Sequence, residues 1–446
     1  MKIWDKGIAV NKLIDDFTVG KDRELDLYLA EADVLGNMAH STMLAEIGLI
    51  DKAELKPLLA EMRTIYNSVK AGEFTIAEEL EDVHSQVEAT LTERLGDIGK
   101  KIHSGRSRND QVLVDLKLYT RAEIKNLVEL TETLAQTLLQ QADVYKDYLM
   151  PGYTHMQVAM PSSFGQWFSS YAESLADDLL VLHAAFKVVN QNPLGSAAGY
   201  GSSFPLDRQM TTDLLGFDSM NVSAVYAQMG RGKMERTVSF ALASIAGTLS
   251  KLAMDTCIFM SQNFGFLKLP DELTTGSSIM PHKKNPDVFE LLRAHCNKIQ
   301  ALPTEMAMIS SNLPGGYSRD FQLMKESFIP AIEDLKSCLH IAEFAISNMK
   351  VTDNLLEDDR YKYVFSVEDV NRQVIAGVPF RDAYRSIGIA IHKGEYEPNR
   401  ELHHTHAGSI GNLCLPLIEA KLKENISQFN FKKIDKKIAE LLESFS

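Results

Sequence analysis

The sequence contains few of the residues that crosslink or interrupt a chain. Only 4 cysteines and 14 prolines occur among 446 residues, and no two cysteines form a Cys-x-x-Cys pair. This spacing argues against a dense disulfide framework and against a zinc ribbon. We expect reduced, mostly buried thiols at Cys257, Cys296, Cys338 and Cys414. With 45% hydrophobic and 24% charged residues, the composition is that of a folded globular protein and not of a collagen-like or disordered chain.

Positive charge and long apolar runs are also scarce. Lys and Arg total 46 against 60 Asp and Glu, which gives a formal net charge of −14. That balance disfavours a broad nucleic-acid surface but leaves room for a local basic pocket that binds a small anion. The N-terminus has no apolar signal-peptide core, and no run of about eighteen consecutive apolar residues follows. We therefore expect a cytoplasmic protein that binds neither nucleic acid nor membrane.

Motifs for nucleotides and metals are missing as well. No Gly-x-Gly-x-x-Gly opens a βαβ unit, and no Walker loop occurs. The only histidine cluster is His403-His404-Thr405-His406, which has no matching carboxylates or cysteines. The sequence predicts a loop at this cluster and no metal site.

Helical periodicity is the dominant pattern. Apolar residues recur at steps of three and four from Ile124 to Leu138 and again from Phe164 to Leu182. Similar patterns cover about 235–263, 286–312 and 325–348. Each is long beside the mean helix of roughly 11 residues, and such helices bury their apolar stripes best against one another. We predict a mainly α protein with a central bundle of long helices.

Shorter and more charged patterns mark both ends of the chain. We place domain boundaries so that residues 1–102 form an N-terminal helical domain, 103–350 the central long-helix bundle and 351–446 a small C-terminal helical domain. Residues 363–367 could form a helix or a strand. The basic stretch 432–437 has helical spacing, which indicates a solvated helix face.

The most informative segment is 275–287, Thr-Gly-Ser-Ser-Ile-Met-Pro-His-Lys-Lys-Asn-Pro-Asp. We predict a mobile loop that leads into a helix, with Asn285 as N-cap and Pro286 at the first helical position. Free backbone N–H groups and Lys283 could then hold a carboxylate, while the Gly-Ser-Ser stretch closes over a ligand. The alternative is an ordinary capped turn, but the Lys-Lys-Asn-Pro continuation favours a functional loop.

Two further segments concentrate polar groups. In His103-Ser104-Gly105-Arg106-Ser107-Arg108-Asn109-Asp110-Gln111, either arginine could hold a carboxylate through two parallel bonds. The alternative is a polar helix start capped by Ser107 or Asn109. In Gly152-Tyr153-Thr154-His155-Met156-Gln157, His155 lies near a break between long helices, where it could transfer a proton, although a lone histidine is more often structural.

Taken together, these segments resemble the aspartase/fumarase superfamily. Its Gly-Ser-Ser-x-Met-Pro-x-Lys-x-Asn-Pro loop matches residues 276–286 throughout. Within the superfamily the chain is similar to the argininosuccinate lyases. That similarity rests on 103–111, on Glu81-Asp82-Val83-His84, on 152–157, on the spacing of Tyr317, Gln322 and Lys325, and on 377–383. It spans about residues 80–385.

The resemblance implies three largely helical domains and a homotetramer whose active sites combine segments of different subunits. It also implies reversible elimination of argininosuccinate to arginine and fumarate, without a metal or an organic cofactor. Ser277 matches the general base, Lys283 and Asn285 the anion-stabilising and positioning residues, and His155 with Glu290 the acid or relay pair. Substrate contacts are expected at Thr18, His84, Ser107, Arg108, Asn109, Thr154, Tyr317, Gln322 and Lys325.

The sequence departs from the family at three places. Trp4-Asp5-Lys6-Gly7-Ile8 replaces the usual Trp-Gly-Gly-Arg-Phe, and Arg231-Gly232-Lys233-Met234 stands where Arg-Asp-Phe is usual. His282 occupies a position where adenylosuccinate lyases have histidine. Two alternatives therefore stay open: another fumarate-releasing lyase such as an adenylosuccinate lyase, and a non-catalytic scaffold or crystallin-like protein of the same architecture.

Overall fold

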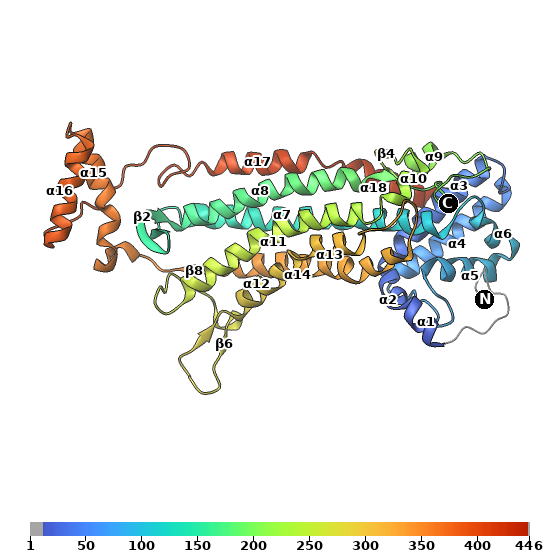
Figure 1. Ribbon diagram of the computed structural model, residues 1–446, viewed down its shortest axis with the longest axis horizontal. Helices are drawn as coiled ribbons and strands as arrows, with labels where there is room; N and C mark the ends of the chain where they lie inside the picture. Colours follow the sequence, from blue (N-terminus) through green and yellow to red (C-terminus); the bar gives the residue numbers. More distant parts are fainter. Residues whose placement is uncertain (1–11, 445–446) are drawn as a thin grey trace.

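The computed structural model describes residues 12–444 of an elongated, almost entirely helical molecule (Figure 1). The mainly α prediction is confirmed. The Trp4–Ile8 segment lies outside the described residues. Within these residues, short 3₁₀-helical turns and four two-stranded β-ribbons connect the α-helices.

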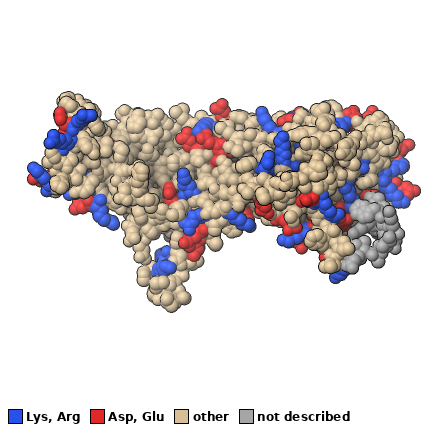
Figure 2. Space-filling view, in the orientation of Figure 1, with Lys and Arg blue, Asp and Glu red and all other residues tan. Residues whose placement is uncertain are grey.

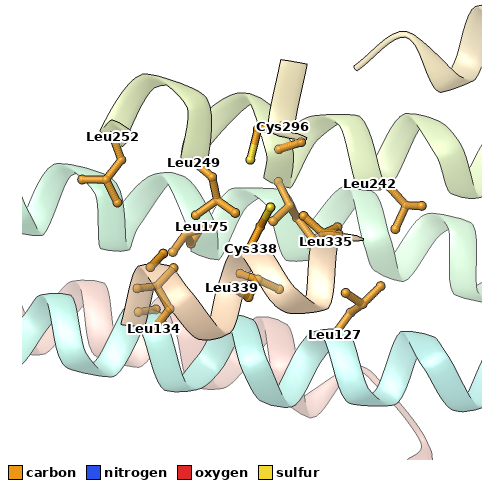
Figure 3. Close-up of a cluster of buried hydrophobic side chains, with 14 of the residues drawn as sticks. Leu127, Leu134, Leu175, Leu242, Leu249, Leu252, Cys296, Leu335, Cys338 and Leu339 are labelled. Carbon is orange, nitrogen blue, oxygen red and sulfur yellow. The ribbon is translucent and has the colours of Figure 1, made fainter. Parts of the chain in front are cut away.

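A bundle of long helices runs along the long axis of the molecule. Its members are α7 (Arg108–Val144), α8 (Phe164–Val189), α11 (Lys233–Met260), α12 (Asp287–Ile299), α13 (Leu302–Ile309) and α14 (Lys325–Ser347). The predicted helix over 286–312 is in fact two helices, because the chain turns at Gln300 and Ala301. Leucines from four helices meet in the bundle core and are fully buried: Leu127, Leu134, Leu175, Leu249 and Leu335 (Figure 3).

Shorter helices gather at one end of the bundle (Figure 1). They are α1 (Lys12–Val19), α2 (Asp22–Leu25), η1 (Asp26–Leu29), α3 (Ala30–Glu46), α4 (Lys52–Lys70), α5 (Val83–Leu95), α6 (Asp97–Lys100), η2 (Lys101–His103), α9 (Arg208–Leu214), α10 (Ala224–Met229) and α18 (Phe431–Glu443). They enclose a second apolar core. Helix α7 contributes Leu116 to the bundle core and Leu118 to the second core, so one helix connects the two.

The C-terminal hundred residues are spread along the molecule. At the opposite end lie η5 (Leu355–Glu357), η6 (Asp359–Phe365), α15 (Ser366–Ile375) and α16 (Phe380–Lys393). Helix α17 (Leu415–Ser427) returns along α8, and α18 packs on α3 and α9. Residues 363–367 are therefore helical, and the basic stretch 432–437 lies on α18, as its spacing predicted. The domain boundaries at 102 and 350 stay a prediction.

The strands are short ribbons. Strands β1 (Leu149–Thr154) and β2 (Gln157–Ser163) form an antiparallel hairpin with an irregularity between Pro151 and Tyr153. The other pairs are β3 (Gln191–Asn192) with β4 (Ser219–Met220), β5 (Leu267–Lys268) with β8 (Lys350–Val351), and β6 (Thr275–Gly276) with β7 (Lys284–Asn285). Two further 3₁₀ turns are η3 (Asp271–Leu273) and η4 (Arg319–Met324).

Helix α11 is the one helix among residues 12–444 whose length and composition would allow it to cross a membrane, with half of its apolar window buried. It packs against α8, α12, α13 and α14. A central bundle helix has this composition because neighbours surround it, so we interpret α11 as a core helix. The four cysteines are free thiols, of which Cys296 and Cys338 are buried and Cys257 and Cys414 half-buried.

Candidate active site

A cavity of about 200 Å³ opens at the end of the bundle where α2 and α5 lie. Residues from α2, η1, α5, α7, η4 and α14 enclose it. Its lining consists of Asp22, Asp26, Glu81, Asp82, His84, Arg108, Asn109, Val112, Arg231, Tyr317, Arg319, Gln322 and Lys325. The structure thus brings together six of the nine predicted substrate contacts, from parts of the sequence more than two hundred residues apart. They are His84, Arg108, Asn109, Tyr317, Gln322 and Lys325.

Two helix starts place the first of these side chains. Asp82 caps α5 by accepting hydrogen bonds from the backbone N–H (2.8 Å) and the hydroxyl (2.6 Å) of Ser85. Ser107 caps α7, and Asp110 completes a capping box by accepting from the Ser107 N–H at 2.9 Å. The caps fix where each helix begins, so Arg108 in the first turn of α7 reaches Asp82 at 2.5 Å. The predicted capping role of Ser107 is confirmed, and its side chain is not part of the cavity wall.

Lys325 lies between two carboxylates in the cavity wall. Its ammonium is 2.6 Å from Asp26 and 2.7 Å from Asp22, and its side chain is 5% exposed. Burial opposes the charge of Lys325, but Asp26 and Asp22 raise its pKa above the ordinary value. Burial raises the pKa of Asp22 to about 6 in spite of Lys325. Near neutral pH this pocket therefore contains a paired lysine and two carboxylates.

The N-terminal segment reaches the cavity through a backbone carbonyl. The hydroxyl of Thr18 donates to Ile14 O at 2.8 Å, while Thr18 O accepts from Arg319 Nη2 at 2.8 Å and from Gln322 Nε2 at 2.9 Å. Arg319 also pairs with Glu81 at 2.6 Å. In this chain Thr18 therefore orients two cavity residues, and its side chain is not part of the cavity wall.

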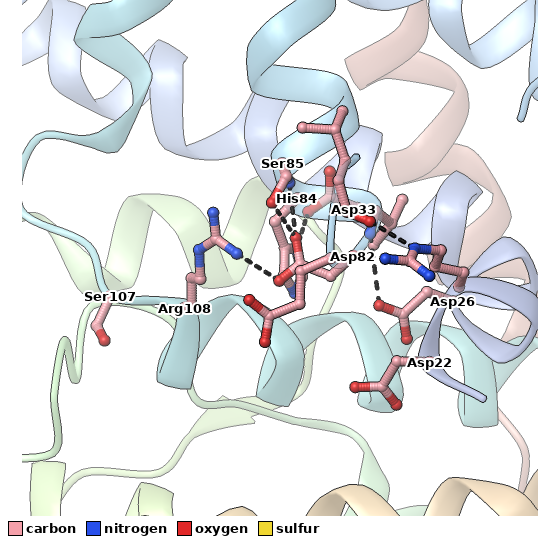
Figure 4. A network of polar contacts seen from close by, with 12 residues as sticks. Asp22, Asp26, Asp33, Asp82, His84, Ser85, Ser107 and Arg108 are labelled. Atoms are coloured by element: carbon pink, nitrogen blue, oxygen red, sulfur yellow. Dashed lines mark hydrogen bonds and ion pairs between the residues drawn. The ribbon is translucent and has the colours of Figure 1, made fainter. Parts of the chain in front are cut away.

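His84 lines the cavity and contacts Asp33 of α3 (Figure 4). Its Nδ1 lies 2.7 Å from Asp33 Oδ1 and 3.4 Å from Asp115 Oδ2. Among residues 12–444 these three side chains are the one group of histidine, cysteine and carboxylate residues close enough to share a metal ion. His404 instead bonds to Ser409 at 2.7 Å and Glu368 at 3.1 Å, which agrees with the predicted loop.

Several cavity residues escaped the sequence analysis. Asp22 and Asp26 are four residues apart on short helical turns, a spacing that places both on one face, but no motif distinguishes them from surface acids. Arg231, noted only as a departure from the family, is buried and bonds to Glu235 at 2.7 Å and to Phe321 O at 2.7 Å. Arg319 precedes Gln322 by one helical turn, the one signal that could have found it.

The predicted catalytic residues lie elsewhere in the chain. Ser277 and Lys283 belong to the protruding loop between β6 and β7, Asn285 lies on β7, and Glu290 is exposed on α12 (Figure 1). The Ser277 hydroxyl accepts from the Met280 N–H at 3.1 Å, a local turn. The predicted cap at Asn285 is wrong, because Asn285 pairs with Thr275 in the β6–β7 ribbon and Pro286 occupies the N-cap position.

Thr154 and His155 lie at the tip of the β1–β2 hairpin, at the far end of the bundle from the cavity. His155 and Met156 are the two turn residues, with φ of +53° and +58°. A two-residue turn with both φ positive usually takes Asn-Gly, and side chains other than glycine are strained there. Such strain is typical of functional positions, and it presents the exposed imidazole of His155 at the hairpin tip.

The visible face of the molecule mixes both signs of charge without a single-sign field (Figure 2). Basic side chains lie on the protruding loop, which contains Lys283 and Lys284. The cavity also contains both signs, with four carboxylates beside Arg108, Arg231, Arg319 and Lys325. This arrangement fits a small ligand that carries both charges better than a polyanion.

Comparison with known proteins identifies the family. A family model described as "Lyase" matches residues 6–301. The argininosuccinate lyase of Phocaeicola vulgatus is 62% identical over 441 residues, with 99% of both chains covered. The chain belongs to the argininosuccinate lyase family. Another member, from Stenotrophomonas maltophilia, is 40% identical over 385 residues, which cover 86% of this chain and 89% of that protein.

Solved structures show that the fold is shared more widely than the argininosuccinate lyase sequence. An EDDS lyase in complex with formate has a TM-score of 0.74 at 20% identity, covering 98% of this chain and 95% of that chain. A fumarate lyase from Mesorhizobium sp. BNC1 has a TM-score of 0.68 at 18% identity, covering 95% and 97%. At such identities the likeness concerns the fold alone, and it agrees with the predicted superfamily architecture.

Proposed function

We propose that this protein catalyses the reversible elimination of argininosuccinate to arginine and fumarate, as the names of its 62% identical relatives indicate. The observation in the structure that supports this most directly is the mixed charge of the cavity. An α-amino acid end presents an ammonium and a carboxylate, which suit Asp22 or Asp26 and Arg108 or Arg319 respectively. A phosphate, as in adenylosuccinate, would favour a more cationic wall.

We further propose that each active site combines segments of different subunits in a homotetramer. Within one chain α2 and α5, which contribute to the cavity wall, lie at one end of the bundle, whereas the loop after β6 and the β1–β2 hairpin lie toward the other end (Figure 1). All three carry motif residues, and all three are exposed at their tips or open to solvent. Closed symmetry can bring such separate surfaces of identical chains together at one point.

In this assembly Ser277 acts as the general base. It removes a proton from the carbon next to the carboxylate that becomes part of fumarate, and the resulting carbanion spreads its charge onto that carboxylate. Lys283 and the free N–H groups of the loop bind this aci-carboxylate more tightly than the ground state, which lowers the barrier. Space around Ser277 supports its role as the base. At the neighbouring Gly276, no atom lies within 4 Å of the position that a Cβ would take, so a ligand can approach there.

His155 and Glu290 then assist departure of the guanidinium nitrogen. A carboxylate partner fixes the tautomer of an imidazole and raises its pKa, so that it can deliver a proton near neutral pH. Asn285 positions the loop, and Thr154 and Ser107 remain proposed substrate contacts. We propose that the reaction needs neither a metal nor an organic cofactor and takes place in the cytoplasm.

The purified protein tests the proposal directly. Supplied with argininosuccinate, it should release fumarate, which is followed by its ultraviolet absorbance. Adenylosuccinate and malate should give essentially none, because a site built to hydrogen-bond the arginine end leaves buried polar groups unpaired with ligands that lack it. Preferential cleavage of adenylosuccinate would establish the alternative enzyme, and no fumarate from any of the three would favour a scaffold.

A further inference from the structure

Two buried aspartates that are not part of the cavity lining lie beside His84, and Figure 4 shows one of them, Asp33. Asp33 on α3 and Asp115 on α7 are each 1% exposed, and neither belongs to a motif of the sequence. Three helices therefore meet at one imidazole. Because Nδ1 is directed at Asp33 at 2.7 Å, Nε2 is the ring nitrogen that remains for a ligand in the cavity.

The surrounding charges determine where the protons lie. Burial opposes a charge on His84, but the Asp33 carboxylate raises the pKa of His84 above the ordinary value. Burial, together with repulsion from Asp33, raises the pKa of Asp115 well above its usual range. Both directions favour the protonated forms of His84 and Asp115, with Asp33 as the charge that attracts the imidazolium.

Other charged groups around the cluster agree with this distribution. Asp82 at the start of α5 and Asp26 of η1 both favour a cationic His84. Arg106, buried before the start of α7, interacts with Asp33 and Asp115 and stabilises one negative charge between them. Asn37 fixes Asp33 from the same helix by donating to its second oxygen at 2.8 Å.

The same three side chains could in principle hold a metal ion. A divalent cation would need both aspartates ionised and would lie close to the Arg106 guanidinium, two of whose nitrogens have no hydrogen-bond partner in the part of the chain described. It would also have to displace the proton shared by His84 and Asp33. The geometry favours a proton over a metal here.

We propose that Asp33 and Asp115 are positioning residues that hold His84 as a cationic donor, with Nε2–H directed at a carboxylate of the ligand in the cavity. Asp33 supplies the negative charge. Asp115 is a neutral acid whose Oδ2 lies 3.4 Å from His84 Nδ1 and has no hydrogen-bond partner within residues 12–444. The inference rests on the proposed function for its choice of ligand, but the protonation of His84 can be measured without any activity.

Two matched amide substitutions distinguish the roles of Asp33 and Asp115. Asp33→Asn removes the charge, so the KM for argininosuccinate at pH 8 should rise roughly tenfold while kcat changes less than about threefold, since His84 binds ground state and transition state alike. Asp115→Asn replaces a neutral acid by a neutral amide of the same size, so its KM should rise clearly less than that of Asp33→Asn. An equal rise in KM in both variants would overturn the assignment of the negative charge to Asp33 and of the proton to Asp115.

The pH profile supplies a readout that a merely structural role would not change. In the wild type 1/KM should fall at alkaline pH as His84 loses its proton. In Asp33→Asn that fall should begin at least about one pH unit lower, with affinity recovered in acid. An unchanged profile would contradict the proposal.

A double mutant tests whether Asp33 acts through His84. In a His84→Gln background, Asp33→Asn should add little to the KM, because its effect passes through the missing imidazole. If the effects of the two substitutions on KM were additive, the proposal would be overturned. Circular dichroism melting of each variant identifies any that fails to fold.

An NMR titration of ¹³C-histidine-labelled wild-type protein needs no turnover. The His84 resonance, identified by its loss in His84→Gln, should titrate above the ordinary histidine pKa of about 6.5. Titration at or below that value would overturn the inference. If the wild type released no fumarate but His84 still titrated high, the proposed function would fail while the assignment of His84 survived.

Discussion

At the scale of single residues, the proposed reaction depends on the hydroxyl of Ser277. Ser277 is half-buried after β6, and its hydroxyl accepts from the backbone N–H groups of Ile279 and Met280. The proposed mechanism therefore requires the field of Lys283 and groups of neighbouring subunits to activate it. Ser277→Ala should lower kcat by roughly 10²-fold or more, the usual scale for a group that transfers the proton. Single-turnover fumarate release by the folded variant measures this, and near wild-type turnover would remove Ser277 from the mechanism.

A second residue prediction concerns Asp22. Its pKa of about 6 means that the carboxylate, and with it the attraction for a substrate ammonium, is lost as the solution is acidified. We expect the titration of Asp22 to raise the KM for argininosuccinate as the pH falls below about 6, on the acid side of the His84 titration. In Asp22→Asn the KM should be higher throughout and should lack this acid limb. Steady-state kinetics from pH 5 to 8 compare the two enzymes, and an identical acid limb in both would assign the titration to another group.

At the scale of elements, helix starts position the cavity residues. The Ser107 hydroxyl accepts from the Asn109 N–H at 3.2 Å at the start of α7. Ser107→Ala should reduce the free energy of unfolding by about 1 kcal/mol, the usual cost of a lost N-cap. Ser107→Asp, which keeps a cap, serves as the matched control. Denaturant unfolding measures the difference, and a large KM increase in Ser107→Ala without a loss of stability would make Ser107 a substrate contact instead.

The elements also show what the sequence could predict. The start of α8 and both ends of α14 agree closely with the prediction, because a continuous apolar stripe encodes both the existence and the buried face of a helix, whereas α8 continues beyond the predicted pattern to Val189. Asn285 was misassigned because a cap and a strand residue look alike locally, and pairing with Thr275 decides between them. Asp22 and Asp26 were missed because their partner Lys325 lies about three hundred residues away and only tertiary packing brings it near.

At the scale of the whole molecule, the separation of the cavity from the loop makes subunit exchange informative. If each site takes Ser277 from one subunit and Lys325 from another, a hybrid tetramer of Ser277→Ala and Lys325→Met chains contains some sites with neither defect. Co-expression of the two inactive variants should give turnover well above either parent. Separately purified, unmixed samples are the control. Hybrids no more active than the parents would contradict shared sites.

One helix couples these scales. Helix α7 starts at Arg108 in the cavity and ends at Val144, just before the hairpin that carries His155, and it contributes to both cores on the way. Its 37 residues make a rod of about 55 Å. Adding a single turn would displace one catalytic segment from the other by about 5.4 Å in every site of a symmetric assembly, beyond what side chains can absorb. Evolution should therefore tolerate insertions in surface loops such as 395–414 far better than in α7, and lineages of this enzyme should keep the length of that helix fixed even where its solvent-facing residues diverge.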